Sequence, residues 1–594
     1  MRLQRNVTCG ELRAKDIDRE VILAGWVRNR RDHGGVHFVD LCDRYGITQV
    51  RFDPGQEAIL EGLKSEYVIA LRGKVEARPE GQINADRPTG EVEVKVLEVE
   101  VLNTSKTPPF EVQEEIEAKE DTRLKYRFVD LRRRPLAEAM VFRSRVTQII
   151  REVFHDEDFV DIETPLLTKT TPEGARDFIV PSRLQPGMVY ALPQSPQLFK
   201  QVLMVSGLDR YYQICKCLRD EDLRADRQPE FTQLDMEMSF VRPDDVFAVV
   251  EKTLQRLWKE LKGVDLPLPF PRMSYAEAMA RFGIDKPDTR FGLELVDMSD
   301  LAATTGFKVF SGAVASGGSV RAIRVPGGAS MPRKKVDALE KVAKEYGARG
   351  LAWVKWNEDG FQGPVGKFLQ ESELHPMLER AGAEPGDLLV FVADRDAVVF
   401  AALAHVRLHL GRTLDLIDES RTDCLWVVDF PLFEYDEEAG HWSAMHHMFT
   451  MPKEPLPAKG EEGDLSGVLG DLYDLVVNGV EMGSGSIRIH RPEVQRRVFE
   501  LVNLSEDDVE AKFGWFLRAL EYGAPPHGGI ALGLDRLVMV MLGRDNLREV
   551  IAFPKNSRGV CPLTESPSEP LGDALDVLGL RFVGVASDDA PQDA

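Results

Sequence analysis

Membrane-length apolar runs, Cys-x-x-Cys pairs and an excess of basic residues are all missing from this 594-residue sequence. Without an apolar run long enough to cross a bilayer, no membrane span is expected. Residues 1–7 lack the apolar core of a secretory signal. The six cysteines therefore predict reduced, mostly buried thiols in a cytoplasmic protein. Cys215 and Cys217 share one strand face and are interpreted as core residues rather than metal ligands.

The charge balance restricts the partners of the chain. The formal net charge is −23, from 75 basic and 98 acidic residues. Such a balance argues against a non-specific nucleic-acid coat, so we expect no DNA partner and no membrane partner. Local basic runs remain at Arg28–Arg31 and Arg132–Arg134. The sequence also shows no Ser-His-Asp arrangement that would indicate a covalent nucleophile.

The first hundred residues predict a small barrel. Five segments alternate like strands, with a short helix over 55–66 between the third and the fourth. The five segments are 20–30, 36–42, 47–53, 67–77 and 91–101. This is the element order of an OB-fold, which binds single-stranded nucleic acid by stacking bases on aromatics and holding phosphates with basic residues. Phe38 on the second strand and Arg31 after the first suit that role; the alternative is a barrel whose aromatics are core.

A charged hairpin over Arg219–Met238 is the most informative stretch of the rest of the chain. Alternation before and after the loop predicts two strands. The second strand places Phe231, Gln233, Asp235 and Glu237 on one face. A half-polar strand usually lines water, but arginines, carboxylates and an aromatic ring together also suit a nucleotide site.

Further polar clusters lie on both sides of this hairpin. A helix over 136–156 precedes a strand that Pro165 interrupts. Thr171–Asp177 and Gln194–Lys200 follow, and the second of these opens a helix. Gly529–Met539 predicts a glycine-rich strand that continues into an apolar helix, with Arg536 placed to meet a phosphate.

Together these segments resemble the class II aminoacyl-tRNA synthetases. The Pro165 strand, the Arg219–Met238 hairpin and the Gly533–Arg536 strand-helix are similar to the three signature motifs of that class, in order. The OB barrel favours the aspartate, asparagine and lysine subgroup. Thr171–Asp177, Gln197–Lys200 and the large insert look like the bacterial-type aspartyl enzymes.

The resemblance implies an α+β multidomain fold and a division of the chain. The predicted parts are an OB-fold anticodon-binding domain (1–104), a linker (105–135), an antiparallel-sheet catalytic domain (136–287 and 417–563), an inserted α/β domain (288–416) and a partly flexible C-terminal extension (564–594). Within the insert, helices are expected over 336–346 and 376–381, strands over 352–355 and 387–393, and loops over 311–318 and 325–329. The insert shows no catalytic constellation.

The implied reaction joins L-aspartate to ATP and then to the 3′ end of tRNA, in the cytoplasm and with Mg²⁺. Arg219 would hold the α-phosphate and the substrate carboxylate, Glu221 would read the adenine amino group, and Phe231 would stack under the base. The implied ATP-binding set is Arg219, Asp220, Glu221, Gln228, Phe231, Glu481, Gly533, Leu534, Asp535 and Arg536. Asp474 and Glu481 are the implied Mg²⁺ ligands.

A charged site would distinguish aspartate from asparagine, because an uncharged amide would leave the buried cations without an anionic partner, which is costly. Lys200 and Arg488 would bind the side-chain carboxylate, and Glu173, Gln197 and Asp235 would meet the ammonium group. His446 would contact the substrate from a mobile loop. The implied aspartate-binding set is Glu173, Gln197, Lys200, Arg219, Asp235, His446 and Arg488. Met448 stands in that loop where the family commonly has proline.

For tRNA, the resemblance implies that Arg31, Phe38 and Gln49 read the central anticodon bases. His33 and Gly81 resemble relaxed enzymes that charge both tRNA(Asp) and tRNA(Asn); strict relatives tend to carry Leu and a longer basic residue there. The alternatives are neutral drift in two surface loops and a strictly tRNA(Asp)-specific enzyme. An asparaginyl or lysyl enzyme and a catalytically dead scaffold are less favoured. A homodimer through the Pro165 strand is expected.

Overall fold

The computed structural model describes residues 1–171 and 173–583. Pro172, in the predicted motif after the Pro165 strand, and the predicted flexible end of the tail, 584–594, lie outside the described residues. Contacts divide the chain into two units. Unit 1 holds Met1–Arg145, Leu223–Ala225 and Asn546–Glu569; unit 2 holds Val146–Asp222, Asp226–Asp545 and the segment from Pro570. Within the described part, no helix is long and apolar enough to cross a membrane.

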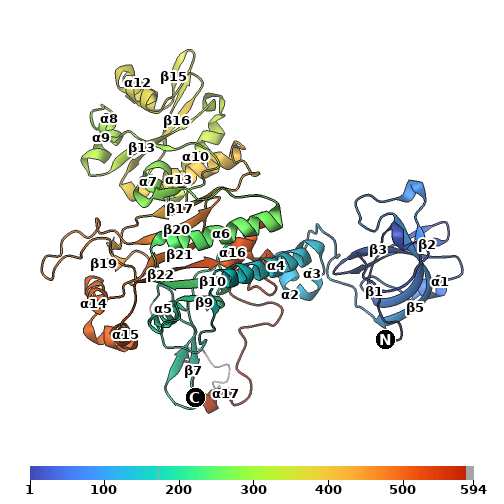
Figure 1. The fold of residues 1–594 in the computed structure, drawn as a ribbon. Coiled ribbons are helices and arrows are strands. Elements are labelled where there is room, and N and C mark those ends of the chain that lie inside the picture. Colours follow the sequence, from blue (N-terminus) through green and yellow to red (C-terminus); the bar gives the residue numbers. More distant parts are fainter. Residues whose placement is uncertain (172, 584–594) are drawn as a thin grey trace, which may run out of the picture. The chain divides into compact units, whose positions relative to one another are not determined.

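Unit 1 contains a closed five-stranded barrel, drawn in blue in Figure 1, with the neighbour order β1-β2-β3-β5-β4. Its strands are β1 (Glu20–His33), β2 (Val36–Asp43), β3 (Gly46–Phe52), β4 (Val68–Ala77) and β5 (Val92–Asn103). Alternate side chains such as Val21, Leu23 and Val39 fill the interior and leave the other strand face for polar residues. The OB-type barrel predicted from the sequence is confirmed.

The helix between β3 and β4 is shorter than predicted. It covers only α1 (Glu57–Glu61), not the whole of 55–66. The chain leaves helical geometry before Glu66, whose φ of 63° is incompatible with a right-handed helix. Unit 1 is completed by η1 (Ala14–Asp16), η2 (Glu80–Gln82), α2 (Glu120–Lys125), α3 (Arg127–Asp130) and η4 (Leu547–Glu549).

Unit 2 is built on an eight-stranded, mostly antiparallel sheet with the order β11-β17-β20-β21-β22-β10-β9-β6. The strands are β6 (Val160–Asp161), β9 (Arg210–Leu218), β10 (Glu230–Ser239), β11 (Arg272–Ser274), β17 (Cys424–Val428), β20 (Leu472–Val477), β21 (Val480–Ile487) and β22 (His527–Gly533). The predicted hairpin is β9–β10, in the interior of the sheet. The predicted strand around Pro165 reduces to two residues, because Pro165 cannot donate to a ladder.

Helices cover one face of this sheet and leave the other for chemistry. Phe154 of α4 (Arg134–Asp156) contacts Tyr212, with ring centroids 4.8 Å apart. Phe247 of α6 (Pro243–Lys262) stacks on Trp426 at 4.1 Å. Since side chains alternate along a strand, β10 directs Met236 toward these helices and Asp235 to the opposite face. Helix α5 (Gln197–Val205) contacts β9 and β10, and α15 (Glu506–Leu520) contacts both α5 and α14 (Pro492–Leu501). Helix α16 (Leu534–Met541) follows β22 and contacts β10.

A second sheet in unit 2 has helices on both sides. Its five strands, in the order β12-β13-β16-β14-β15, are β12 (Leu295–Asp297), β13 (Ser319–Val325), β14 (Ala352–Asn357), β15 (Gly360–Gln362) and β16 (Leu388–Asp394). Apolar clusters join one face to α10 (Arg333–Glu345) and α13 (Asp396–Thr413). Other clusters join the second face to α8 (Ser299–Ala303), α9 (Lys308–Ala315), α11 (Val365–Phe368) and α12 (Glu371–Arg380). In Figure 1 these elements form the yellow-green layered part.

One expectation about this segment is wrong. Ser311 lies inside α9 rather than in a loop, because Phe310 and its apolar neighbours bury a face of the segment against the sheet. The remaining elements are α7 (Tyr275–Phe282), η3 (Gly328–Ser330), α17 (Ala574–Leu578) and two small hairpins, β7 (Ile179–Pro181) with β8 (Val189–Ala191) and β18 (Phe433–Asp436) with β19 (His441–Ala444).

Candidate active site and nucleic-acid face

Two cations and two carboxylates meet on the open face of the large sheet, and all four are almost fully buried. Lys200 Nζ lies 2.7 Å from Asp235 Oδ1 and 3.2 Å from Glu237 Oε2. Arg488 donates to both Glu237 oxygens, at 2.9 Å from Nε and 3.3 Å from Nη2. Buried ions survive only when paired, so this balanced quartet is held in one geometry.

The two carboxylates of the quartet differ in pKa. Burial raises the pKa of Asp235, and Lys200 offsets this only in part. Burial would also raise the pKa of Glu237, but Arg488 and Lys200 together hold it below its ordinary value. Asp235 Oδ2 has no hydrogen-bond partner. A buried acceptor of this kind suits an ammonium donor from a ligand.

Arg488 is held from several sides. Its Nη1 donates to Ser486 Oγ at 2.7 Å and lies 2.9 Å from His447 Nε2. Burial and the nearby Arg488 charge hold the pKa of His447 well below its ordinary value, so its ring is neutral and can accept from the guanidinium. A fixed guanidinium presents its donors in a plane that matches a carboxylate.

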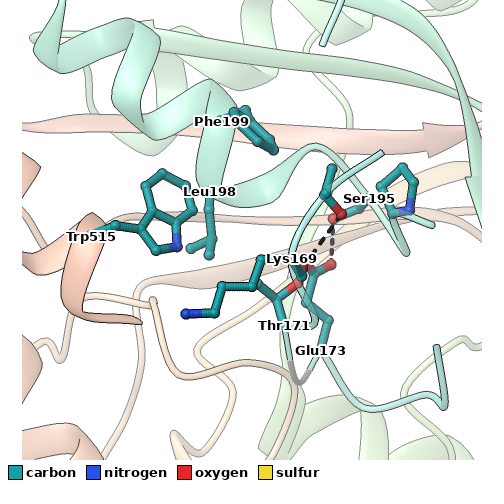
Figure 2. Close-up of a pocket in the computed structure, with 9 residues that line it drawn as sticks. Lys169, Thr171, Glu173, Ser195, Leu198, Phe199 and Trp515 are labelled. Atoms are coloured by element: carbon teal, nitrogen blue, oxygen red, sulfur yellow. Dashed lines mark hydrogen bonds between the residues drawn. The ribbon is translucent and has the colours of Figure 1, made fainter. Parts of the chain in front are cut away.

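Glu173 and Ser195 line a neighbouring cavity of about 360 Å³ (Figure 2). Ser195 Oγ donates to Glu173 Oε2 at 2.6 Å. Burial raises the pKa of Glu173 to about 7, against the opposing effects of Ser195 and Arg219. The other walls are largely apolar and include Phe199 and Trp515. Gln197, at the start of α5, has a buried amide Nε2 without a partner.

The β9–β10 hairpin places cationic and aromatic groups together. The Arg219 guanidinium carbon lies 5.1 Å from the centroid of Phe231. In the connecting loop, Glu221 pairs with Arg227 at 3.4 Å and Asp220 pairs with Arg176 at 3.5 Å. Gln228, just before the second strand, is buried. An aromatic face beside an arginine suits a nucleobase and its phosphates.

Asp535 and Arg536, at the start of α16, lie in different surroundings. Arg536 donates to the Glu481 carbonyl at 2.8 Å and lies 3.6 Å from Asp226. Asp535 instead faces inward, where its carboxylate accepts from the Thr232 backbone N–H at 2.7 Å. Leu534 is fully buried, so only its backbone can reach a ligand. Arg536 is therefore the partly exposed side chain of the predicted motif.

Acidic residues surround His446 at one end of the site. Asp474 Oδ2 lies 3.6 Å from His446 Nε2, and Asp474 Oδ1 is buried without a partner. Burial would lower the pKa of His446, but Asp474, with Glu481 and Asp285, raises it. Glu481 lies 3.7 Å from Lys286 Nζ. In the part of the chain that the structure describes, no three His, Cys, Asp or Glu residues form a metal cluster. The orphaned Asp474 oxygen fits a cation that takes its other ligands from phosphates and water.

In unit 1, the predicted anticodon readers share the outer barrel face. Arg31 lies opposite Phe38 across β1 and β2, and Arg31 Nη2 donates to Gln49 Oε1 at 3.2 Å. The rings of His33 and Phe38 meet edge to face, 6.0 Å apart. Gly81 lies in η2, where an added Cβ would meet only open space.

Asp40 and Arg87 tie the loop that carries Gly81 to this face. Arg87 donates to both Asp40 oxygens, at 3.0 and 3.1 Å, and Arg31 donates to the same carboxylate at 3.0 Å. Glu93 in turn accepts from Gln49 at 2.9 Å. Four strands and one loop are thus joined into one polar surface beside an aromatic ring, as a reader of single-stranded bases requires.

Comparisons with known proteins show the family of the chain. Residues 119–557 match the family model described as tRNA synthetases class II (D, K and N), and residues 21–102 match the OB-fold nucleic acid binding domain. An aspartate–tRNA ligase of Macrococcus caseolyticus is 53% identical over 97% of this chain and 98% of its own length. An aspartate–tRNA(Asp/Asn) ligase of Anoxybacillus flavithermus is 52% identical over the same shares.

The chain belongs to the aspartate–tRNA ligase family of class II synthetases. It is an aminoacyl-tRNA ligase, and the resemblance stated from its motifs is confirmed. Solved structures support the fold: asparaginyl-tRNA synthetase from Pyrococcus horikoshii has a TM-score of 0.57 at 18% identity, covering 93% of this chain and 98% of its own. Aspartyl-tRNA synthetase from Entamoeba histolytica has the same TM-score and identity, covering 93% and 92%.

Several residues of this ligase site were missed by sequence reasoning. Glu237 was placed on the correct face but given no role, although it contacts both buried cations. Ser195, which donates to Glu173, received no function. His447 was expected only as part of the loop that carries His446, and its contact with Arg488 was missed. In the barrel, Asp40 and Arg87 were missed because the contact joins residues 47 positions apart. For these residues, the one useful signal in the sequence was the alternation of β10, which places Glu237 on the same face as Asp235.

Proposed function

We propose that this chain activates L-aspartate with ATP, transfers the aspartyl group to tRNA(Asp), and also charges tRNA(Asn). The observation that carries aspartate activation is the buried quartet in which Lys200 and Arg488 face Asp235 and Glu237. Free aspartate brings one ammonium and two carboxylates. The unpartnered Asp235 oxygen suits the ammonium, and the cations suit the side-chain carboxylate.

In the first step, an oxygen of the aspartate α-carboxylate attacks the α-phosphorus of ATP. The bond to the diphosphate breaks, so the products are aspartyl-adenylate and diphosphate. Arg219 lies beside Phe231, where it can neutralise the α-phosphate while the ring supports the adenine. Glu221, Gln228 and Arg536 bind other parts of ATP.

In the second step, a hydroxyl of the terminal ribose of tRNA attacks the aspartyl carbonyl and AMP leaves. No enzyme nucleophile is needed, because positioning and charge neutralisation supply the rate. Asp474 and Glu481 would hold Mg²⁺, whose chemistry when bound is to neutralise the phosphates of ATP. Glu173 and His446 help to orient the amino acid before each attack.

Relaxed tRNA choice is supported by the barrel and by the names of relatives. The Anoxybacillus flavithermus and Aquifex aeolicus relatives, both 52% identical, are described as aspartate–tRNA(Asp/Asn) ligases. His33 packs against the edge of Phe38, and Gly81 adds no side chain to the face. With no bulky or cationic contact there, either pyrimidine at the third anticodon position is tolerated.

We also propose a cytoplasmic homodimer. Val160, Leu166 and Leu167, in and after the Pro165 segment, are 48%, 54% and 53% exposed, which suits a face covered by a second copy. We propose separately that residues 288–416 form the inserted domain. Light scattering of the purified protein tests the dimer, and a monomeric mass would contradict it.

The deciding experiment compares substrates on pure enzyme. Aspartate, and not asparagine or lysine, should drive ATP–diphosphate exchange, and transcripts of both tRNA(Asp) and tRNA(Asn) should accept aspartate. The double variant His33→Leu, Gly81→Lys should lose charging of tRNA(Asn) by at least tenfold while keeping tRNA(Asp) and exchange. No charging of tRNA(Asn) by the unmodified protein would leave a strict tRNA(Asp) ligase.

A further inference from the structure

Cys215 and Cys217 lie on the same sheet face as Phe231, which we propose to stack under the adenine of ATP. In an antiparallel pair, directly opposite residues share a face. Cys217 lies opposite Phe231 and Cys215 lies opposite Gln233. The helices α4 and α6 cover the other face, so these two thiols point toward the substrate side of the sheet. They therefore do not belong to the core between sheet and helices.

The two sulfurs are close together and have an oxygen beside them. Their Sγ atoms are 3.8 Å apart, and the Cys217 thiol donates to Gln233 Oε1 at 3.1 Å. Both cysteines are free, and their exposed fractions are 4% and 0%. The hydrogen bond with Cys215 and burial raise the pKa of Cys217, so this thiol keeps its proton unless a metal ion displaces it.

The distance between the two sulfurs matches the distance between two thiolates that bind one metal ion. Two thiolates bound to tetrahedral Zn²⁺ at about 2.3 Å each are separated by about 3.8 Å. The pair therefore needs no change of the strand to chelate such an ion. Gln233 Oε1, 3.1 Å from the Cys217 sulfur, offers a further oxygen ligand. Soft thiolates select thiophilic ions over Mg²⁺.

We propose that Cys215 and Cys217 form a binding site for a thiophilic divalent cation, such as Zn²⁺ or Cd²⁺, whose occupancy inhibits aspartate activation. The ion displaces two protons and takes up space beside Phe231, between the thiolates and Gln233. The bound ion changes the surface on which adenine stacks and so weakens the binding of ATP. The inference rests on the proposed position of ATP, and the site is distinct from Asp474 and Glu481.

The test uses the full chain, reduced and then freed of reductant. ZnCl₂ is titrated into the ATP–diphosphate exchange assay at saturating Mg²⁺, and CdCl₂ is titrated while thiolate-to-metal absorption is recorded in the ultraviolet. We expect one Cd²⁺ per chain bound through two thiolates, and an apparent KM for ATP that rises at least fivefold. Cys215→Ser and Cys217→Ala should each lose the inhibition at least tenfold relative to their own metal-free activity.

Cys424→Ser is the matched control, because Cys424 is also buried in the large sheet, on β17. It should retain both the absorption and the inhibition. Equal inhibition of all variants, or no thiolate absorption in the unmodified chain, would overturn the metal site. Exchange without added Zn²⁺ tests the proposed function separately, since aspartate-dependent activity in the metal-free protein does not depend on this site. Thermal melting shows whether each variant is folded.

Discussion

Glu237→Gln tests how the buried quartet selects aspartate. Glu237 contacts Arg488 at 2.9 and 3.3 Å and Lys200 at 3.2 Å. Removing one partner of a buried ion pair costs about 3–5 kcal/mol, because the remaining charge stays buried without compensation. The variant should therefore melt at a lower temperature than the unmodified protein.

The same substitution should weaken the binding of aspartate more than the binding of ATP. Glu237 fixes the plane of the Arg488 guanidinium, so its loss misdirects a charge-assisted bond worth about 1.5–3 kcal/mol. Since each 1.4 kcal/mol is about tenfold, the aspartate KM should rise roughly 10- to 100-fold. Aspartate-dependent ATP–diphosphate exchange measures this, and the ATP KM should stay within about threefold because Phe231 and Arg536 are untouched.

A second buried carboxylate provides the control. Glu251 is 5% exposed and accepts hydrogen bonds from Trp426 Nε1 at 2.9 Å and the Phe270 N–H at 3.2 Å. Glu251→Gln should lower stability without moving the aspartate KM. An unchanged aspartate KM in Glu237→Gln, or an equal rise in both variants, would refute the positioning role.

The pH dependence of stability gives a further check. The pKa of Glu237 is lowered in the folded protein, chiefly because the Arg488 and Lys200 charges outweigh burial. Its contribution is therefore present above the ordinary carboxylate pKa and is lost as pH falls through the folded value. The Gln variant lacks this contribution at all pH values, so the two unfolding curves should converge toward acid.

Three other outcomes are expected. Burial raises the pKa of Glu173 to about 7, so aspartate kcat/KM should increase as pH rises through about 7, and Glu173→Gln should remove that inflection. The stability contributed by Glu173 should fall between about pH 4.5 and 7, because the acid ionises in the unfolded chain while it stays protonated in the fold. Phe231→Ala should raise the ATP KM about 5- to 100-fold, because stacking on one base is worth about 1–3 kcal/mol, and should leave the aspartate KM unchanged. Arg87→Met should free the Gly81 loop from Asp40 and lower tRNA kcat/KM about tenfold in aminoacylation assays, with exchange unaffected; equal loss in exchange would point to misfolding.

Much of the fold followed from local patterns. The alternation of the barrel strands and of the β9–β10 hairpin predicted strands that the structure contains, because a period of two places alternate side chains in the core. Local patterns failed where packing overrode them. The segment around Ser311 became a helix against the second sheet, and the Pro165 strand shortened to two residues.

The sequence by itself determined which chemical groups are available and which face of β10 carries Asp235 and Glu237. It could do so because strand periodicity is a local property of consecutive residues. Only the tertiary structure decided that Arg488, 251 positions away from Glu237, is its partner, and that the polar face is buried rather than lining water. Partners so distant are chosen by the order of strands in the sheet, which brings β10 and β21 to either side of β22. That order places the selecting cations against the carboxylates, and no spacing along the chain encodes it.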